Sequence, residues 1–202
     1  MALTVSILDD GKEVFTNVKQ FAAIPYTDIN GETLGTKAYV FDNLEADSVS
    51  FTPDDNTTNT RDGETKDEPI IENVVLGRCQ FAATSLDMRS EVLTSMMGWT
   101  EDKPNGVTYA PSTYKPLYVC ILVSFTSTGK MLVAPKVKIN SKDVFATLKT
   151  SSGEGQLAGT CYSTTVTAGD SPIKTPRFLL DSSKSVTIGG QTITNEELVA
   201  SN

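Results

Sequence analysis

Histidine is absent from the 202-residue chain, and its absence excludes several classes of catalytic site. Without an imidazole there is no Ser-His-Asp triad, no Cys-His pair and no imidazole ligand for a metal ion. Glycine-rich phosphate-binding patterns are also missing, and three cysteines are too few for an all-thiolate zinc site. We therefore expect no enzyme activity, no cofactor and no metal ion.

Carboxylates offer two weaker candidates for a chemical site. Asp54, Asn56, Thr58 and the run 62–64 supply oxygen ligands suited to calcium, but the glycine is misplaced for an EF-hand loop. The neighbouring acids at 196 and 197 point apart, so they do not form a glycosidase pair. Solvated side chains are the simpler interpretation of both groups.

Cysteines are few, and long apolar runs are lacking. Cys79, Cys120 and Cys161 form no CxxC motif, and an odd number cannot pair completely, so we interpret them as buried thiols. No run approaches the roughly 20 apolar residues that span a bilayer, so no membrane segment is expected. Met1–Leu8 lacks the basic start and apolar core of a secretory signal, which favours synthesis in a reducing cytoplasm.

Charge is unevenly distributed along the sequence, although the formal net charge is -8. Residues 42–72 hold ten acids and two bases, whereas residues 103–149 hold seven lysines and the single acid Asp143. The two segments therefore carry -8 and +6. The bulk charge gives no general attraction to nucleic acid or to an anionic membrane, so electrostatic contacts must be local.

One amphipathic helix is predicted over residues 84–98. Thr84 or Ser85 supplies a capping oxygen, and Asp87 adds negative charge to the first turn. Gly98 supplies a left-handed exit. The apolar face of the helix, with a tryptophan folded back onto it, is predicted to be core. These core residues are Leu86, Val92, Leu93, Met96, Met97 and Trp99.

Strand patterns occupy most of the remaining chain. Residues 3–7 alternate and predict a strand. Leu117–Val123 is apolar without alternation, which indicates a strand covered on both faces. Lys136–Ile139 alternates and indicates one wet face, and Pro135 beside it indicates an edge or a bulge.

The C-terminal region of residues 170–202 is predicted to be an arm that contains a hairpin. Residues 185–188 and 191–194 read as strands, and Gly189-Gly190 between them is a two-residue hairpin signal. The fold class predicted for residues 1–202 is therefore mainly β, a single domain with a β-sandwich or barrel of antiparallel strands and one flanking α-helix.

Residues 52–69 contain no large apolar side chain and are predicted to form an acidic excursion loop. Unstructured loops of this length are usually functional or disordered. Two interpretations stay open: a solvated excursion, or a loop held by neighbouring copies of the chain. The acids that would make the contact are Asp54, Asp55, Asp62, Glu64, Asp67 and Glu68.

The lysine-rich segment offers a surface of the opposite sign. Its candidate residues are Lys130, Lys136, Lys138, Lys142 and Lys149. A wet sheet face, a DNA-binding groove that uses Phe125 and Phe145, and a docking surface for the acidic loop of another copy are all consistent with the pattern. We hypothesise that the loop acids dock on lysines of an adjacent copy.

Three stretches carry a family resemblance. They are Ser-Val-Ser-Phe-Thr-Pro-Asp-Asp through Arg-Asp-Gly-Glu-Thr-Lys-Asp-Glu-Pro (48–69), Ser-Leu-Asp-Met-Arg-Ser-Glu-Val-Leu-Thr-Ser-Met-Met-Gly-Trp (85–99) and Pro116-Leu117-Tyr118-Val119. With the β-rich remainder, they resemble the major tail (tail tube) proteins of long-tailed bacteriophages.

The resemblance implies a tail-tube-like fold whose copies form hexameric rings that stack into a hollow tube. Its implied partners are other copies, a tape-measure protein, tail-end proteins and double-stranded DNA that passes through without sequence recognition. The implied location is the virion tail, after assembly in the bacterial cytoplasm, and the loop at 52–69 would reach a neighbouring ring. The lysine-rich segment departs from the acidic lumen expected of the family.

A carbohydrate-binding or adhesion β-sandwich is the alternative function. It requires exposed aromatic side chains in a groove, because sugar rings stack on such surfaces. The candidates in this sequence are Trp99 and the stretch from Tyr109 to Tyr118.

Overall fold

The computed structural model describes residues 18–41, 43–63, 66–75, 77–86, 88–144 and 154–195. Within these ranges only the backbone is described at 59–63, 66–75 and 142–144. The described chain is mainly β, as predicted, with antiparallel sheets and one α-helix. The strand predicted at residues 3–7 lies outside the described residues.

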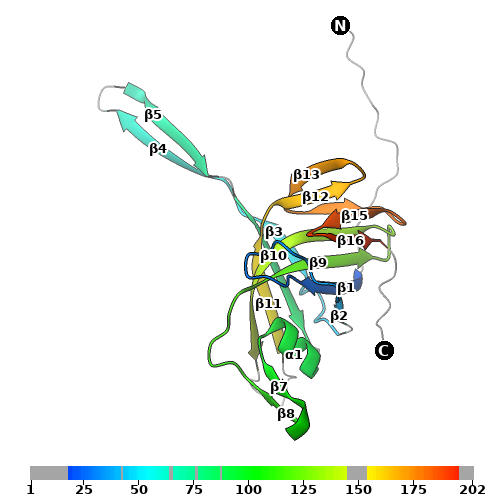
Figure 1. Ribbon diagram of the computed structural model, residues 1–202. Helices are drawn as coiled ribbons and strands as arrows, with labels where there is room; N and C mark the ends of the chain where they lie inside the picture. The colour runs from blue at the N-terminus through cyan, green and yellow to red at the C-terminus, as the bar shows by residue number, and fades with distance from the viewer. Residues whose placement is uncertain are drawn as a thin grey trace.

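The strands fall into two sheets and two separate hairpins (Figure 1). The larger sheet contains β1 (Val18–Pro25), β2 (Tyr39–Phe41), β3 (Ser50–Pro53), β6 (Cys79–Ser85), β9 (Leu117–Phe125), β10 (Met131–Val144), β11 (Glu154–Cys161) and β14 (Phe178–Leu180). The smaller sheet contains β12 (Thr164–Ala168), β13 (Ser171–Thr175), β15 (Ser185–Ile188) and β16 (Gln191–Thr194). The hairpins are β4 (Thr57–Gly63) with β5 (Lys66–Val75), and β7 (Thr100–Asp102) with β8 (Val107–Tyr109).

The larger sheet is open. Its strand order is β2-β1-β9-β10-β11-β6-β3, and β14 pairs with the start of β10. The described strands therefore do not close into a barrel, and the sandwich alternative of the predicted fold class fits. The smaller sheet, in the order β13-β12-β15-β16, packs over one part of the larger sheet (Figure 1).

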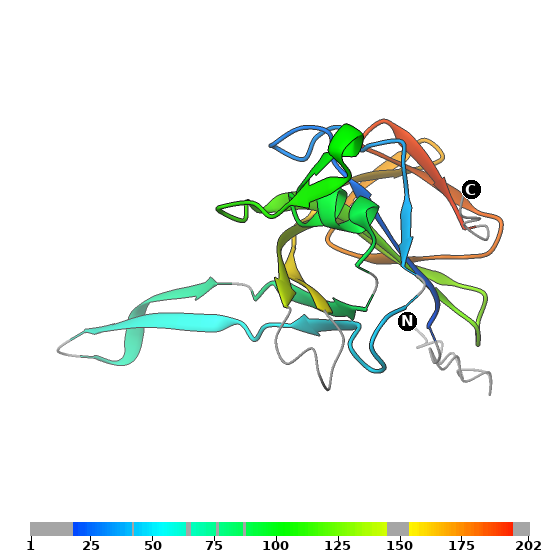
Figure 2. The same cartoon turned by 90° about the horizontal axis from the view of Figure 1, so that it is seen from below.

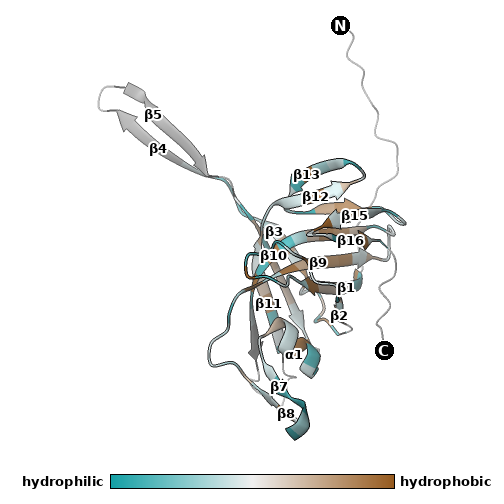
Figure 3. Cartoon of the chain, viewed as in Figure 1, coloured by the Kyte–Doolittle hydropathy of each residue, from teal (hydrophilic) through white to brown (hydrophobic). Residues whose placement is uncertain are grey.

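Strand β9 is covered on both faces from Val119 to Val123, which confirms the prediction for that part of the apolar run, whereas Leu117 and Tyr118 are half-buried. Val119, Ile121 and Val123 belong to one core, which also contains the buried residues of α1 (Ser90–Met96). Cys120 and Leu122 point the other way, into a second core shared with the smaller sheet. Figure 3 shows the apolar colour concentrated in β9 and its neighbours.

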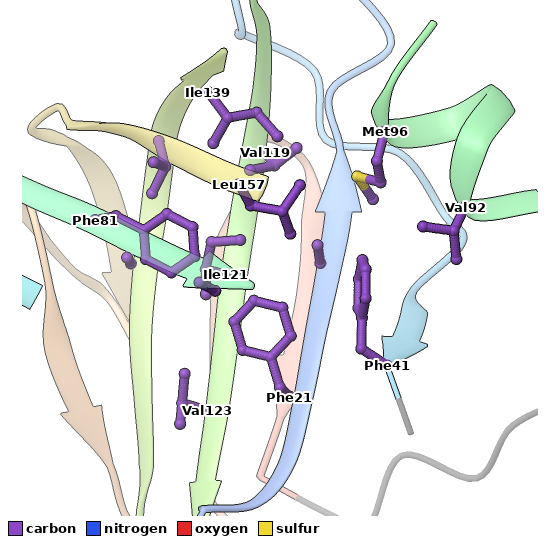
Figure 4. Close-up of a cluster of buried hydrophobic side chains, with 14 of the residues drawn as sticks. Phe21, Phe41, Phe81, Val92, Met96, Val119, Ile121, Val123, Ile139 and Leu157 are labelled. Carbon is purple, nitrogen blue, oxygen red and sulfur yellow. The ribbon is translucent and has the colours of Figure 1, made fainter. Parts of the chain in front are cut away.

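The first core is closed by aromatic side chains and by the helix. Phe21 lies edge-on to Phe41 at 5.3 Å between ring centroids and stacks with Phe81 at 6.1 Å. Figure 4 shows Val92 and Met96 reaching toward this cluster from the helix. Fully burying each such side chain contributes roughly 1.5 to 3 kcal/mol, so this core stabilises the larger sheet.

The predicted start of the helix is wrong. The helix runs from Ser90 to Met96 with Arg89 at its N-cap, where no side chain caps it. Thr84 and Ser85 instead end β6, where they pair with Gln156 and Gly155 of β11. Sheet pairing across the chain has outweighed a local capping preference, because a strand hydrogen-bonded on both sides cannot also begin a helix. Asp87 lies outside the described residues.

The helix exit and most of its core face are as predicted. Gly98 has φ +72°, and Val92, Leu93, Met96 and Met97 are buried. Trp99 packs against the same core. Leu86 is the exception, because it lies before the helix and is 40% exposed.

The prediction of an unstructured loop at 52–69 is also wrong. Residues Thr57–Gly63 pair with Lys66–Val75 as an antiparallel ribbon, from Thr57↔Val75 to Gly63↔Lys66. The β-branched threonines of this segment favour extended backbone. The register shifts beside the Asp62↔Pro69 pair, because proline has no N–H to donate to a ladder. We call this β4–β5 ribbon the arm; it is distinct from the C-terminal region of residues 170–202. Figures 1 and 2 show it projecting from the body.

Two further local predictions are confirmed. The β9–β10 register shifts between Ala134 and Val137, which places a bulge at Pro135. Strands β15 and β16 form the predicted hairpin, with φ +52° at Gly189 and +82° at Gly190. This hairpin is part of the smaller sheet, and residues 196–202, including Glu196 and Glu197, lie outside the described residues.

Candidate functional site

The five candidate lysines do not form one surface in the described structure. Lys130 follows the β9–β10 turn, where its Nζ lies 3.5 Å from Asp181 Oδ1. Lys136 and Lys138 lie farther along β10, beyond the bulge. The side chain of Lys142 and all of Lys149 lie outside what is described. Two of the five lysines are therefore brought together.

Lys136 and Lys138 meet two tyrosines. Tyr118 of β9 is the register partner of Lys138, and its ring lies 4.7 Å from Lys136 Nζ and 5.9 Å from Lys138 Nζ. The Tyr162 ring lies edge-on to Tyr118 at 6.2 Å. Arg78 Cζ lies 5.2 Å from the Tyr162 ring, and Arg78 Nη1 donates to Tyr162 Oη at 3.4 Å.

We call this group the cation–aromatic patch: Arg78, Tyr118, Lys136, Lys138 and Tyr162. Strand alternation explains its position. Val137 and Ile139 enter the first core, so the lysines on either side of Val137 face the opposite side of the sheet. Both tyrosines and both lysines are half-buried, and Arg78 is exposed. The patch is an ordered positive surface that an anionic group can contact, with cation–π contacts each worth about 0.5 to 1 kcal/mol.

A tight loop packs against the patch. The Asp28 carboxylate accepts hydrogen bonds from the backbone N–H groups of Thr33 (2.6 Å), Asn30 (2.9 Å) and Glu32 (3.0 Å). These bonds, with that of Thr33 foremost, hold the pKa of Asp28 below its ordinary value. Lys136 Nζ donates to the carbonyl oxygen of Asn30 at 2.7 Å. The loop is therefore fixed to the patch at its lysine.

Gly31 makes the closest approach of this loop to the patch. Its φ is +66°, and a Cβ there would lie 2.7 Å from Tyr118 Cγ and 2.8 Å from Lys136 Cε. Only glycine suits both constraints. At the tip of the same loop, Ile29 is 89% exposed. An apolar side chain is thus presented to solvent on the loop that packs against the cations.

The bulge beneath the patch is held by the half-buried phenol of Tyr26. Tyr26 Oη donates to the carbonyl oxygen of Pro135 at 2.6 Å, and burial raises the pKa of Tyr26 above its ordinary value. On the other side, the backbone N–H of Tyr162 donates to the Lys136 carbonyl at 2.7 Å. These bonds fix the backbone that carries the lysines.

The patch lies at the root of the arm. Asp54 N–H donates to the Arg78 carbonyl at 2.7 Å, and Gly77 N–H donates to Asn56 Oδ1 at 2.9 Å. A Cβ at Gly77 would overlap the carbonyl oxygen of Asp54, so the two strands of the root approach more closely than any other residue permits. The root is therefore a close contact between two segments of the same chain, held by hydrogen bonds.

The predicted acidic residues are distributed along the arm and its root. Asp54 and Asp55 lie before β4, and Asp54 Oδ2 accepts from Gln80 Nε2 at 2.6 Å. Asp62 lies in β4, and Asp67 and Glu68 lie in β5, where their side chains are outside the described set. Glu64 is outside the described residues. Among the described residues, no group of three or more acidic or cysteine side chains is placed to hold a metal ion.

The three cysteines are buried free thiols, as predicted. Burial raises the pKa of Cys161 to about 12 and raises that of Cys120 further. Arg177 Nη1 lies 3.5 Å from Cys79 Sγ. Cys120 and Cys161 are thus held as protonated thiols, which are poor nucleophiles.

The aromatic candidates for a sugar-binding groove lie in different surroundings, and Tyr114 is exposed. Trp99 packs against the first core, Tyr109 is 54% exposed, and Tyr118 belongs to the cation–aromatic patch. A hollow beside them, lined by the segments 95–100 and 111–117, has no aromatic lining residue. Phe125, proposed as a nucleic-acid contact, packs against the first core, and Phe145 lies outside the described residues.

Sequence reasoning missed Arg78 and Tyr162, and it considered Tyr118 only as a candidate for a sugar-binding groove. They are far apart in the chain and meet only through the pairing of β9 with β10 and of β6 with β11. One signal was available: Tyr118 is a polar-tipped residue within an apolar strand, and such residues often mark where covering layers end.

No helix in the described ranges is both long enough and apolar enough to span a bilayer. Comparison with known proteins leaves the family open, because the chain matches no protein-family model and no curated protein.

Proposed function

We propose that this protein is a structural subunit that self-assembles, through rings that stack, into a hollow tube of the kind found in the tails of long-tailed bacteriophages. The observation that carries the proposal is the arm. Strands β4 and β5 pair with each other and with no other described strand, and they project from the sandwich (Figures 1 and 2). An isolated two-stranded ribbon is marginally stable in water, so a neighbouring copy is the natural support.

Open sheet edges support the same proposal. Strands β2 and β3 end the larger sheet, and β13 and β16 end the smaller one. Exposed edges invite pairing, and edge-to-edge contact in a closed ring removes them. Head-to-tail stacking would in addition bring the acidic arm of one copy to a positive surface of the next.

In this role the subunit has no catalytic residues. Its partners are other copies of itself, a tape-measure protein within the tube and tail-end proteins. Double-stranded DNA passes through the tube without sequence recognition. The virion tail is the proposed location, and six copies per ring is the number the resemblance favours.

The test compares the full chain with a variant in which residues 57–75 are replaced by a short Gly-Ser linker. Sedimentation and electron microscopy over a range of concentrations should show tubes for the full chain and free subunits or isolated rings for the variant. Circular dichroism should show that the variant keeps its β-sandwich. Solitary particles of the full chain at every concentration, with no cylinder in micrographs, would contradict the proposal.

A further inference from the structure

We infer that the cation–aromatic patch is the docking site for the acidic end of the arm of a second copy. The inference rests on the proposed function and identifies the receiving surface that self-assembly through the arm requires.

The three cations of the patch are not neutralised within the described side chains. The ion pairs of that part of the chain join Lys37 to Glu91, Lys103 to Glu101 and Lys130 to Asp181. Two acids on segments next to the patch already have other donors. Asp28 accepts from its own loop, and Asp54 accepts from Gln80.

The patch is organised before a partner arrives. Lys136 is held by the Asn30 carbonyl and by the Tyr118 ring, and Arg78 is held against Tyr162. Side chains fixed in this way lose less conformational entropy on binding than free lysines do. The guanidinium of Arg78 can also form paired hydrogen bonds with one carboxylate.

The acidic end of the arm is complementary to this surface in charge and in apolar character. Asp62, Asp67 and Glu68 lie toward the far end of the arm, and two isoleucines follow at 70 and 71. The surface offers three cations and, on the loop that packs against them, the exposed Ile29. A segment that is acidic and then apolar is complementary to a surface that is cationic and apolar. The phosphate backbone of nucleic acid would contact the cations but offers no apolar group for Ile29 to pack against.

The arm that docks on the patch belongs to a second copy, because the arm of the same chain points away from it. The patch lies at the root of the arm, and the acids lie at its far end. A seven-residue strand such as β4 is about 23 Å long, so a projecting arm holds its acidic end away from the patch of the same chain.

Charge reversal on both sides tests the inference. R78E/K138E and D67K/E68K should each reduce the assembled fraction at least tenfold in low salt, and the combination of all four changes should restore most of it. The matched control is K184E, which reverses an exposed lysine just before β15, an inner strand of the smaller sheet, and should assemble like the parent. Circular dichroism checks that each variant is folded, and R78Q/K138Q provides a neutral version should the reversal fail to fold.

Each outcome has one meaning. If the parent forms tubes and R78E/K138E forms them equally well, the docking inference is wrong while the proposed function stands. If the parent forms no tubes, the proposed function itself is wrong. If R78E/K138E assembles normally but no longer retains duplex DNA, the patch binds nucleic acid and the inference is wrong. The inference is also wrong if combining R78E/K138E with D67K/E68K recovers no assembly.

Discussion

The body and the arm are both antiparallel β-structure, yet they differ in what their strands pack against. In β9, five successive side chains from Val119 to Val123 are buried between two cores. In the described chain, β4 and β5 hydrogen-bond only to each other. The same backbone geometry therefore serves two purposes: burial stabilises the body from within, and under the proposed function the arm is supported by a neighbouring copy.

The largest expected effect is a loss of stability of the body. Phe81 is fully buried, stacks with Phe21 and lies 5.2 Å from Phe51 between ring centroids. Phe81→Ala should lower the free energy of unfolding by about 3 to 5 kcal/mol, because it removes contacts and leaves a cavity. Denaturant unfolding of unassembled protein measures this. Ile173→Ala, at an exposed position of β13, is the control and should stay within about 0.5 kcal/mol of the parent.

The next effect is confined to the arm. Gly77→Ala should force the two strands of the root apart and weaken the hydrogen bond from Asp54 N–H to the Arg78 carbonyl. We expect local opening of the root to become easier by about 1 to 3 kcal/mol, as measured by amide hydrogen exchange. The unfolding midpoint of the body should stay nearly unchanged; an equal loss in body and root would show that the two are not separable.

An effect of similar size concerns the loop at the patch. Gly31→Ala should destabilise the protein by about 1 to 3 kcal/mol, because it combines a left-handed φ with close contact to Tyr118 and Lys136. Gly169→Ala is the matched control, with φ +58° and open space around the new Cβ. The difference between the two variants in thermal unfolding isolates the steric contribution, and equal effects would contradict the packing described.

The smallest effect is the pH dependence of the same loop. The pKa of Asp28 is lowered in the folded protein, so its hydrogen bonds stabilise the fold fully above its unfolded pKa of about 3.9. That contribution is lost as the pH falls through the lower folded value. Asp28→Asn should therefore be less stable than the parent at pH 6, and the gap should narrow below about pH 4. A gap that is constant with pH would contradict this assignment.

Sequence patterns predicted the fold well where the deciding interactions are local or where apolar runs are long. Most of the apolar run Leu117–Val123, from Val119 on, is covered on both faces, and Gly189-Gly190 permits a tight hairpin without any distant partner. The helix start was wrong because Thr84 and Ser85 suit both a cap and a strand. Their pairing with β11, more than sixty residues later, decides between the two.

The candidate site was less predictable than the fold. Charge counting identified Lys136 and Lys138, but Arg78, Tyr118 and Tyr162 join them only through strand register, which charge does not reveal. The arm was hidden by its polar composition. Residues 57–69 contain no large apolar side chain, so the periodicity that normally indicates a strand is absent there.

Amide hydrogen exchange along the arm, before and after assembly, tests the central claim most directly. In free subunits, amides of β4 and β5 should exchange far faster than those of β9, and assembly should slow them by at least tenfold while β9 changes little. Arm amides that are equally protected in both states, or that stay fast in a formed assembly, would contradict the account.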